Sequence, residues 1–232
     1  MKTFKLHFIR NGISEANVQG IYCGSTDSPL SERGRKELLE LLEEGDYPYI
    51  DILFTSPLSS DIETARILYP GCETRVIDSL KETHFGEFEG RSLDELKLDA
   101  NFQKWAAPAG EYLPIGAEHP SDFLNRICGA TQSIVRTMMN EGIYSAAIVA
   151  HMGVISNIFS AMAYPQSDPY NWTCDGGCGY TAIADPILFM REPVLEVIAK
   201  VPFPDDYRQD LEITDWDDSQ WDPAWDSELQ EN

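Results

Sequence analysis

Short apolar runs alternate with longer segments whose apolar residues recur every three or four positions. The short runs predict β-strands at residues 3–9, 51–55, 76–77, 145–150, 181–189 and 194–200. The periodic segments predict helices at residues 31–44, 57–68, 92–105, 120–141 and 153–162. Because strands and helices alternate, we expect an α/β fold, a three-layer sandwich with a mostly parallel central sheet and helices on both faces.

Two of these helices have start signals in the sequence. Ser31 is a residue type that caps helix N-termini, and a stripe of leucines follows it. Pro57 can occupy the first turn of a helix, because its missing N–H would have no helical partner there. We therefore expect one helix to begin after Ser31 and another at Pro57.

The C-terminal segment differs in composition from the rest of the chain. Residues 1–204 are expected to form one domain, and the acidic tail at 205–232 contains eleven Asp and Glu residues. The tail also contains Trp216, Trp221 and Trp225, three of the five tryptophans. Tryptophan rings favour burial, so we expect them to pack on the domain or across a dimer, which makes a homodimer possible. A mobile tail that binds a partner is the alternative.

Charge and cysteine content narrow the partners and the compartment. The net charge of −22 over 232 residues repels nucleic acid and anionic membranes, so neither is an expected partner. No run reaches the roughly 18 apolar residues of a membrane span. The five cysteines are scattered, which favours a reduced, cytoplasmic protein. Cys174 and Cys178 have no second pair at ligand spacing, so no metal is expected.

Candidate chemistry gathers where the predicted strands end. Arg10 and Asn11 follow the first strand, Ser56 follows the second, and His151 follows the fourth. In α/β proteins the carboxyl ends of the strands form the functional edge, so these residues are expected to converge. A histidine at the mouth of a strand is more often functional than structural. Glu82 lies on a glycine-bearing loop, where it is either a proton donor or an ordinary surface charge.

Six segments occur in an order and spacing that a known family shares. They are Arg10-Asn11-Gly12 with Ser14, Glu15 and Asn17, then Gly24 to Gly34, Thr55 to Ala65, the loop with Glu82, Pro114 to Glu118, and Ala150 to Ile155. Together, from about residue 4 to 200, they resemble the histidine phosphatase superfamily, also called the phosphoglycerate mutase-like family. Each segment is weak evidence alone, and the ordered set is strong. The resemblance implies a phosphoglycerate mutase-like fold.

The resemblance also implies a reaction and roles for its residues. In that family a histidine attacks a phosphomonoester, and water hydrolyses the resulting phosphohistidine without a cofactor or metal. By resemblance, Glu82 is the general acid that protonates the leaving alkoxide. Arg10 and His151 then belong to the groups that stabilise the phosphoryl oxygens, with Asn17 and Thr26 as further phosphate-binding residues.

The chain departs from the family pattern at the centre of the site. Asn11 occupies the position of the nucleophile, and Ser60 occupies the position of a second clamp arginine, followed by Asp61. An amide nitrogen is a poor nucleophile because its lone pair is delocalised into the carbonyl. Losing a nucleophile can cost on the order of 10⁶ in kcat. Arg66 could replace the lost arginine only by reaching around a helical turn.

Three interpretations of these departures stay open. The first is a natural pseudophosphatase that binds a small phosphorylated molecule or inorganic phosphate without turnover. The second is an engineered inactive form of a phosphomonoester hydrolase that acts through a phosphohistidine in its parent form, and the third is an active enzyme with another nucleophile, such as His151. Several departures in one pocket favour the first. The segments Tyr22 to Asp27 and Gly86 to Gly90 resemble the small phosphatase branch, which includes α-ribazole phosphatases, rather than the mutases.

Overall fold

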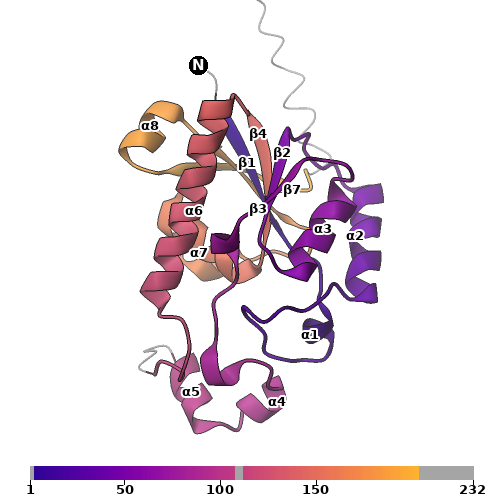
Figure 1. Cartoon of the computed structure of the whole chain (residues 1–232), viewed down its shortest axis with the longest axis vertical. Helices are drawn as coiled ribbons and strands as arrows, with labels where there is room; N and C mark the ends of the chain where they lie inside the picture. The colour runs from indigo at the N-terminus through magenta and orange to yellow at the C-terminus, as the bar shows by residue number, and fades with distance from the viewer. Residues whose placement is uncertain (1–2, 108–111, 204–232) are drawn as a thin grey trace, which may run out of the picture.

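The computed structural model describes residues 3–107 and 112–203, which form a central sheet with helices around it (Figure 1). The strands are β1 Phe4–Arg10, β2 Ile52–Thr55, β3 Thr74–Val76, β4 Ser145–Ala150, β5 Ala163–Tyr164, β6 Gly179–Ala184 and β7 Leu195–Val201. The α-helices are α1 Glu15–Val18, α2 Glu32–Glu44, α3 Ser59–Leu68, α4 Leu93–Leu96, α5 Ala100–Ala106, α6 Pro120–Glu141, α7 Met152–Met162 and α8 Pro186–Arg191. Short 3₁₀ helices lie at η1 Asp78–Leu80, η2 Gly86–Phe88 and η3 Pro169–Trp172.

The strands form one mixed sheet in the order β3-β2-β4-β1-β6-β7-β5. Four of its six pairings are parallel, namely β3 with β2, β2 with β4, β4 with β1, and β5 with β7. β6 gives the sheet its mixed character, because it pairs antiparallel with both β1 and β7. The predicted mostly parallel α/β fold is therefore confirmed.

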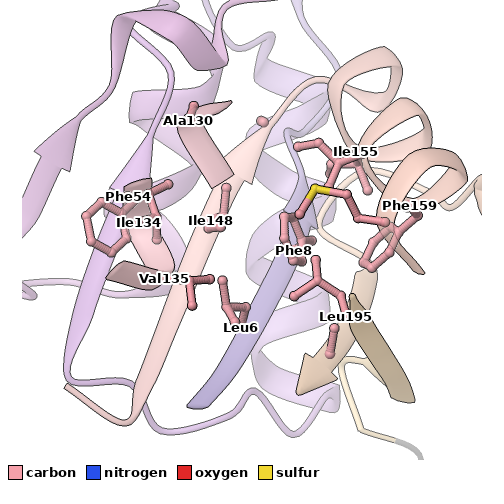
Figure 2. Close-up of a cluster of buried hydrophobic side chains, with 14 of the residues drawn as sticks. Leu6, Phe8, Phe54, Ala130, Ile134, Val135, Ile148, Ile155, Phe159 and Leu195 are labelled. Carbon is pink, nitrogen blue, oxygen red and sulfur yellow. The ribbon is translucent and has the colours of Figure 1, made fainter. Parts of the chain in front are cut away.

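Helices cover both faces of the sheet, as the sequence predicts. α6 and α7 lie on one face, and α2 and α3 lie on the other (Figure 1). Successive strand residues point to opposite faces, so Phe8 and Ile148 pack under α6 and α7, whereas Ile9 and Val149 pack under α2 and α3. Figure 2 shows part of the first cluster, with strand and helix side chains interdigitated: Leu6, Phe8, Phe54, Ala130, Ile134, Val135, Ile148, Ile155, Phe159 and Leu195.

The prediction of one helix over 92–105 is wrong, because the segment forms the two short helices α4 and α5. Asp99 separates them, since its carboxylate accepts the N–H groups of Asn101 and Phe102 at 2.9 and 3.4 Å and starts a new helix. Both helices lie beyond the end of the sheet to which β1 runs (Figure 1). They have an apolar cluster of their own, built on Phe88, Leu96 and Phe102.

The expected start of α3 at Pro57 is also wrong, and the reason is a local hydrogen bond. The helix begins at Ser59, after an extended Leu58. The Ser56 hydroxyl accepts the N–H of Leu58 at 3.1 Å and holds Pro57 in a bend before the helix. By contrast, Ser31 caps α2 as predicted, with its hydroxyl accepting the N–H of Gly34 at 2.9 Å.

The predicted strand at 181–189 ends early. β6 stops at Ala184, and the remaining residues form α8. Asp185 causes the change, because its carboxylate accepts the N–H groups of Ile187 and Leu188, both at 2.9 Å, and caps the helix. The apolar residues after it belong to a helix turn rather than to a strand.

Two further expectations concern membrane-spanning helices and the C-terminal tail. No helix among the described residues is long and apolar enough to cross a membrane. The predicted acidic tail at 205–232, with Trp216, Trp221 and Trp225, lies outside the described residues.

The fully buried Phe8 should carry a large share of the stability of the sheet. Its ring packs edge-on against Phe159 of α7 at a centroid distance of 4.8 Å. We expect Phe8→Ala to lower the free energy of unfolding by about 3–5 kcal/mol, because it leaves a cavity between β1 and α7. Urea denaturation followed by circular dichroism measures this loss. Leu98→Ala, at a side chain that is 86% exposed, is the control and should change the value little; equal losses would contradict the assignment of the core.

Candidate active site

The parallel strands bring the predicted residues to one edge of the sheet. Arg10 at the end of β1 is in register with Ala150 at the end of β4, so Asn11 and His151 leave the sheet side by side. The backbone N–H of Asn11 donates to the carbonyl of Ala150 at 3.2 Å. Arg10, Asn11, His151 and Glu82 line one pocket of about 490 Å³. The predicted convergence at the carboxyl ends of the strands is therefore what the structure shows.

Asn11 lies at the floor of this pocket with its amide held in place. The side chain is 6% exposed, and its Nδ2 donates to the Gly12 carbonyl at 3.0 Å and to the Ser60 hydroxyl at 3.2 Å. The turn beneath it is tight, because a Cβ on Gly12 would stand 2.8 Å from methyl carbons of Leu30 and Leu38. The amide can donate hydrogen bonds here but offers no nucleophilic lone pair.

Ser60 supports Asn11 from α3 and lies behind it, without lining the pocket itself. It is 1% exposed and is not among the residues that line the cavity. The neighbouring Thr64 ties this turn of α3 to the β1 turn, since its hydroxyl donates to the Ser60 carbonyl at 2.7 Å and accepts the Gly12 N–H at 2.9 Å. The first strand and α3 therefore form one hydrogen-bonded unit under the pocket.

A buried pair between Asp61 and His151 is the main feature that the sequence did not reveal. Asp61 has no exposed surface, and both of its carboxylate oxygens lie 3.0 Å from His151 Nδ1. A carboxylate can only accept, so Nδ1 carries the hydrogen and donates it. The Ser56 hydroxyl donates to the second carboxylate oxygen, Oδ2. Three residues from the ends of β2 and β4 and from α3 thus form one hydrogen-bonded chain.

One sequence signal could have placed Asp61 inside. Asp61, Ala65 and Leu68 recur at helical spacing, and all three lie on the buried face of α3. A carboxylate on the apolar stripe of a helix needs a charged or donating partner. Its partner is 90 residues away in the sequence, so only the fold identifies it as His151.

The charges around His151 act on its pKa in opposing directions. Burial of the ring lowers the pKa, whereas the Asp61 charge and hydrogen bond raise it, the Glu82 charge raises it further, and Arg10 lowers it. The net result is a raised pKa. The imidazolium form therefore persists to higher pH than in a free histidine.

Glu82 is buried beside His151, which excludes the interpretation of an ordinary surface charge. It is 6% exposed rather than a surface charge, and its Oε1 accepts the N–H of Thr83 at 2.8 Å. Burial raises its pKa, with the His151 charge opposing the shift. Arg126 of α6 holds the loop, because its guanidinium donates to the Glu82 carbonyl at 3.1 Å and pairs with Glu118 at 2.6 Å. Glu82 is thus a positioned group that keeps its proton at higher pH than an exposed glutamate.

The remaining predicted site residues take different places. Arg10 lines the pocket, and its guanidinium also donates to the Cys174 carbonyl. Asn17 lines the pocket too, but its Oδ1 accepts from the backbone N–H and hydroxyl of Ser14 in a capping box at the N-terminus of α1. Thr26 is not among the residues that line the pocket, and Arg66 is an exposed residue in the last turn of α3.

One wall of the pocket is aromatic and is formed by α5 and by two loops that precede it in the chain. Tyr22, Phe85 and Trp105 line the cavity, and their rings contact one another with centroids 4.5 to 5.9 Å apart. The cavity therefore joins a polar floor at the sheet edge to an apolar wall. Over residues 3–107 and 112–203, no group of three or more His, Cys, Asp or Glu side chains could hold a metal ion.

The comparison with protein families decides the affiliation that this geometry suggests. The model described as "Histidine phosphatase superfamily (branch 1)" matches residues 6–184. The chain belongs to the histidine phosphatase superfamily. The match spans β1 to β6 and contains Arg10, Asn11, Glu82 and His151. The resemblance that the six sequence segments suggested is confirmed at the level of the superfamily.

Individual members of the superfamily are similar to the chain over most of its length. The adenosylcobalamin/alpha-ribazole phosphatase of Salmonella typhi is 27% identical over 185 residues, covering 76% of this chain and 89% of that protein. A broad-specificity phosphatase of Saccharomyces cerevisiae is 30% identical over 172 residues, covering 69% and 70%. The crystal structure of the alpha-ribazole phosphatase from Shigella flexneri superposes with a TM-score of 0.69 at 24% identity, covering 84% and 95%. This last likeness shows the shared fold.

Gly153 should be needed for the position of Glu82. A Cβ at residue 153 would stand 2.5 Å from Glu82 Oε2 and 2.7 Å from Oε1, whereas a Cβ on Gly129 of α6 would meet nothing within 4 Å. Gly129→Ala should raise the free energy of unfolding by about 0.5–1 kcal/mol through helix propensity. Gly153→Ala should lower it, because the buried carboxylate must move. Urea denaturation of both variants tests this, and equal gains would show that Glu82 moves aside at no cost.

Proposed function

We propose that the chain is a phosphomonoester-binding member of the histidine phosphatase superfamily that lacks phosphohistidine turnover. In this proposal Asn11 stands at the nucleophile position and Ser60 at the position of the second clamp arginine. The single observation that carries it is the fixed amide of Asn11 at the pocket floor, hydrogen-bonded to Gly12 and Ser60. No lone pair of that amide nitrogen is available to attack phosphorus.

The groups around Asn11 support binding of an anion. Arg10 and His151 line the pocket and supply the positive charge that phosphoryl oxygens require. Glu82 holds a proton beyond the usual pH range of a glutamate, so it can donate a hydrogen bond to a neutral or anionic ligand oxygen. In an active relative with a nucleophile at position 11, the same proton would go to the leaving alkoxide.

The pocket wall and the relatives support a phosphorylated small molecule as the ligand. The rings of Tyr22, Phe85 and Trp105 offer an apolar surface next to the anion-binding floor. Two relatives carry the names alpha-ribazole phosphatase and broad-specificity phosphatase. A phosphomonoester with a ring substituent would use both parts of the cavity, whereas inorganic phosphate would use only the floor.

Anion binding should depend on Arg10. We expect phenyl phosphate to bind at low ionic strength with a Kd near millimolar, about −4 kcal/mol, because Arg10 is the one arginine among the described residues that line the pocket and the net charge is −22. Inorganic phosphate should bind more weakly, since it has no ring to pack on the wall. Isothermal titration calorimetry measures both. Arg10→Ala should abolish the heats, and Arg66→Ala is the matched control because Arg66 is exposed on α3.

Two results would contradict this assignment. Equal heats from the unmodified chain and Arg10→Ala would place anion binding outside the pocket. Binding of phenol as tight as that of phenyl phosphate would show that the aromatic wall, rather than the phosphoryl group, provides the affinity.

The lost reaction should return when the nucleophile and clamp are restored. We expect no detectable hydrolysis of p-nitrophenyl phosphate by the unmodified chain, since loss of a nucleophile can cost on the order of 10⁶ in kcat, roughly 8 kcal/mol. Asn11→His should give a weak phosphatase, because an imidazole Nδ1 can donate to the Gly12 carbonyl as the amide does now. Adding Ser60→Arg should increase the rate by more than its own single effect, because both groups act on one transition state.

Alkaline quench during turnover identifies the residue that carries the phosphoryl group, because the N–P bond of phosphohistidine survives in alkali and hydrolyses in acid. In the Asn11→His, Ser60→Arg variant it should trap phosphate on residue 11. Hydrolysis of p-nitrophenyl phosphate by the unmodified chain at ordinary enzyme rates would contradict the proposal. His151 would then be the first nucleophile to test. A silent double variant would mean that the pocket differs from an active one at more than these two residues.

A further inference from the structure

The carboxylate of Asp61 lies directly behind the pocket and reaches it only through His151. It has no exposed surface, and both of its oxygens are 3.0 Å from Nδ1 of the ring. His151 lines the pocket, and its side chain is 19% exposed. Because Nδ1 is bonded to Asp61, Nε2 is the nitrogen that remains for a ligand. The ring therefore stands between a buried negative charge and the cavity.

A buried carboxylate at this place could act on a bound anion in two opposite ways. Its own charge repels the anion. It also stabilises the charged form of the ring, and that ring is nearer to the ligand than the carboxylate is. The Ser56 hydroxyl donates a hydrogen bond to Asp61 Oδ2, and this bond stabilises the negative charge of the carboxylate. The nearer cation should dominate, because Coulomb energy falls with distance.

We propose that Asp61 is a positioning residue that holds His151 as an imidazolium with Nε2 toward the cavity. Arg10 and His151 then form a two-cation cradle for a doubly charged tetrahedral oxyanion, such as the phosphoryl group of a monoester. The cradle takes the place of a second arginine, which Ser60 cannot provide. The inference rests on the proposed function, because it assigns the second cation of the same anion site.

The arrangement sets the direction of the pH dependence. With the pKa of His151 raised, the cradle is complete below that pKa and loses a cation as the pH rises through it, so affinity for the anion falls with rising pH. Glu82 also gains a negative charge as the pH rises, and it shares the pocket. His84 lines the cavity as well. An experiment must therefore separate His151 from these two groups.

Sulfate is the suitable probe, because it keeps its double charge throughout the range in which histidine titrates. We would measure its affinity by calorimetry from about pH 5 to about pH 9 in the Glu82→Gln background, which removes the second acid. Affinity should fall by about tenfold or more across this range. Asp61→Asn in that background should move the midpoint down by about one pH unit or more. Asp94→Asn is the charge-matched control, since that side chain is 95% exposed on α4.

Nuclear magnetic resonance supplies a second measurement that needs no ligand. The chain has four histidines, so the His151 ring signal can be assigned as the one lost in His151→Gln. In the unmodified chain this signal should titrate above the range of a free histidine, and in the Glu82→Gln background it should titrate at the midpoint of sulfate binding. A ring that titrates at or below the free range would overturn the inference, even if Asp61→Asn does not fold.

The remaining outcomes separate this inference from the proposed function. Tighter sulfate binding by Asp61→Asn at every pH would show that Asp61 only repels the anion, and loss of the pH dependence in His84→Gln would assign it to His84. Either result overturns the inference. Sulfate binding that is lost in Arg10→Ala but unchanged in Asp61→Asn also overturns the inference, and it leaves the proposed function standing. No sulfate binding at any pH in the unmodified chain would overturn both.

Discussion

The parallel pairing of β1 with β4 is the constraint on which the site depends. It sets Arg10 opposite Ala150, and the residues that follow, Asn11 and His151, leave the sheet at the same level. A shift of β1 by one residue against β4 would turn Phe8 away from α6 and α7 and would separate Asn11 from His151. The buried alternation of the strands therefore fixes the geometry of the pocket floor as well as the core.

The polar floor of the pocket is a set of matched hydrogen bonds rather than an active site with one part removed. The Asn11 amide donates to the Ser60 hydroxyl, and the next residue of α3, Asp61, holds His151. A fully buried carboxylate is tolerated only when its partners compensate its lost hydration, and here Ser56 and His151 do so. Replacing Asn11 or Ser60 singly breaks a bond of this set. The energetic effects of the two positions are coupled for that reason.

The sequence predicted the parts of the molecule that depend on local pattern and strand order. The strands at 145–150 and 3–9, and the meeting of Asn11 with His151 at one edge, follow from apolar runs and from the rule that parallel strands end together. The errors arose where a side chain competes with the apolar pattern, as Asp99 and Asp185 do by capping new helices. No local pattern could show that Asp61 pairs with a ring on another element. Pairings between distant segments need the fold.

Separation of the core from the pocket allows this fold to carry different side chains at the site. The two apolar clusters lie under the helices on either face of the sheet, whereas Asn11 follows the end of β1 and Ser60 lies in the first turn of α3. Changing the side chain at position 11 or 60 therefore removes nothing that the core needs. Burial of Glu82 and Asp61 lowers the stability of the fold, because each carboxyl group loses hydration free energy that an apolar side chain of similar size would not lose. A pocket that only filled space would be more stable without them, so their chemistry points to a ligand.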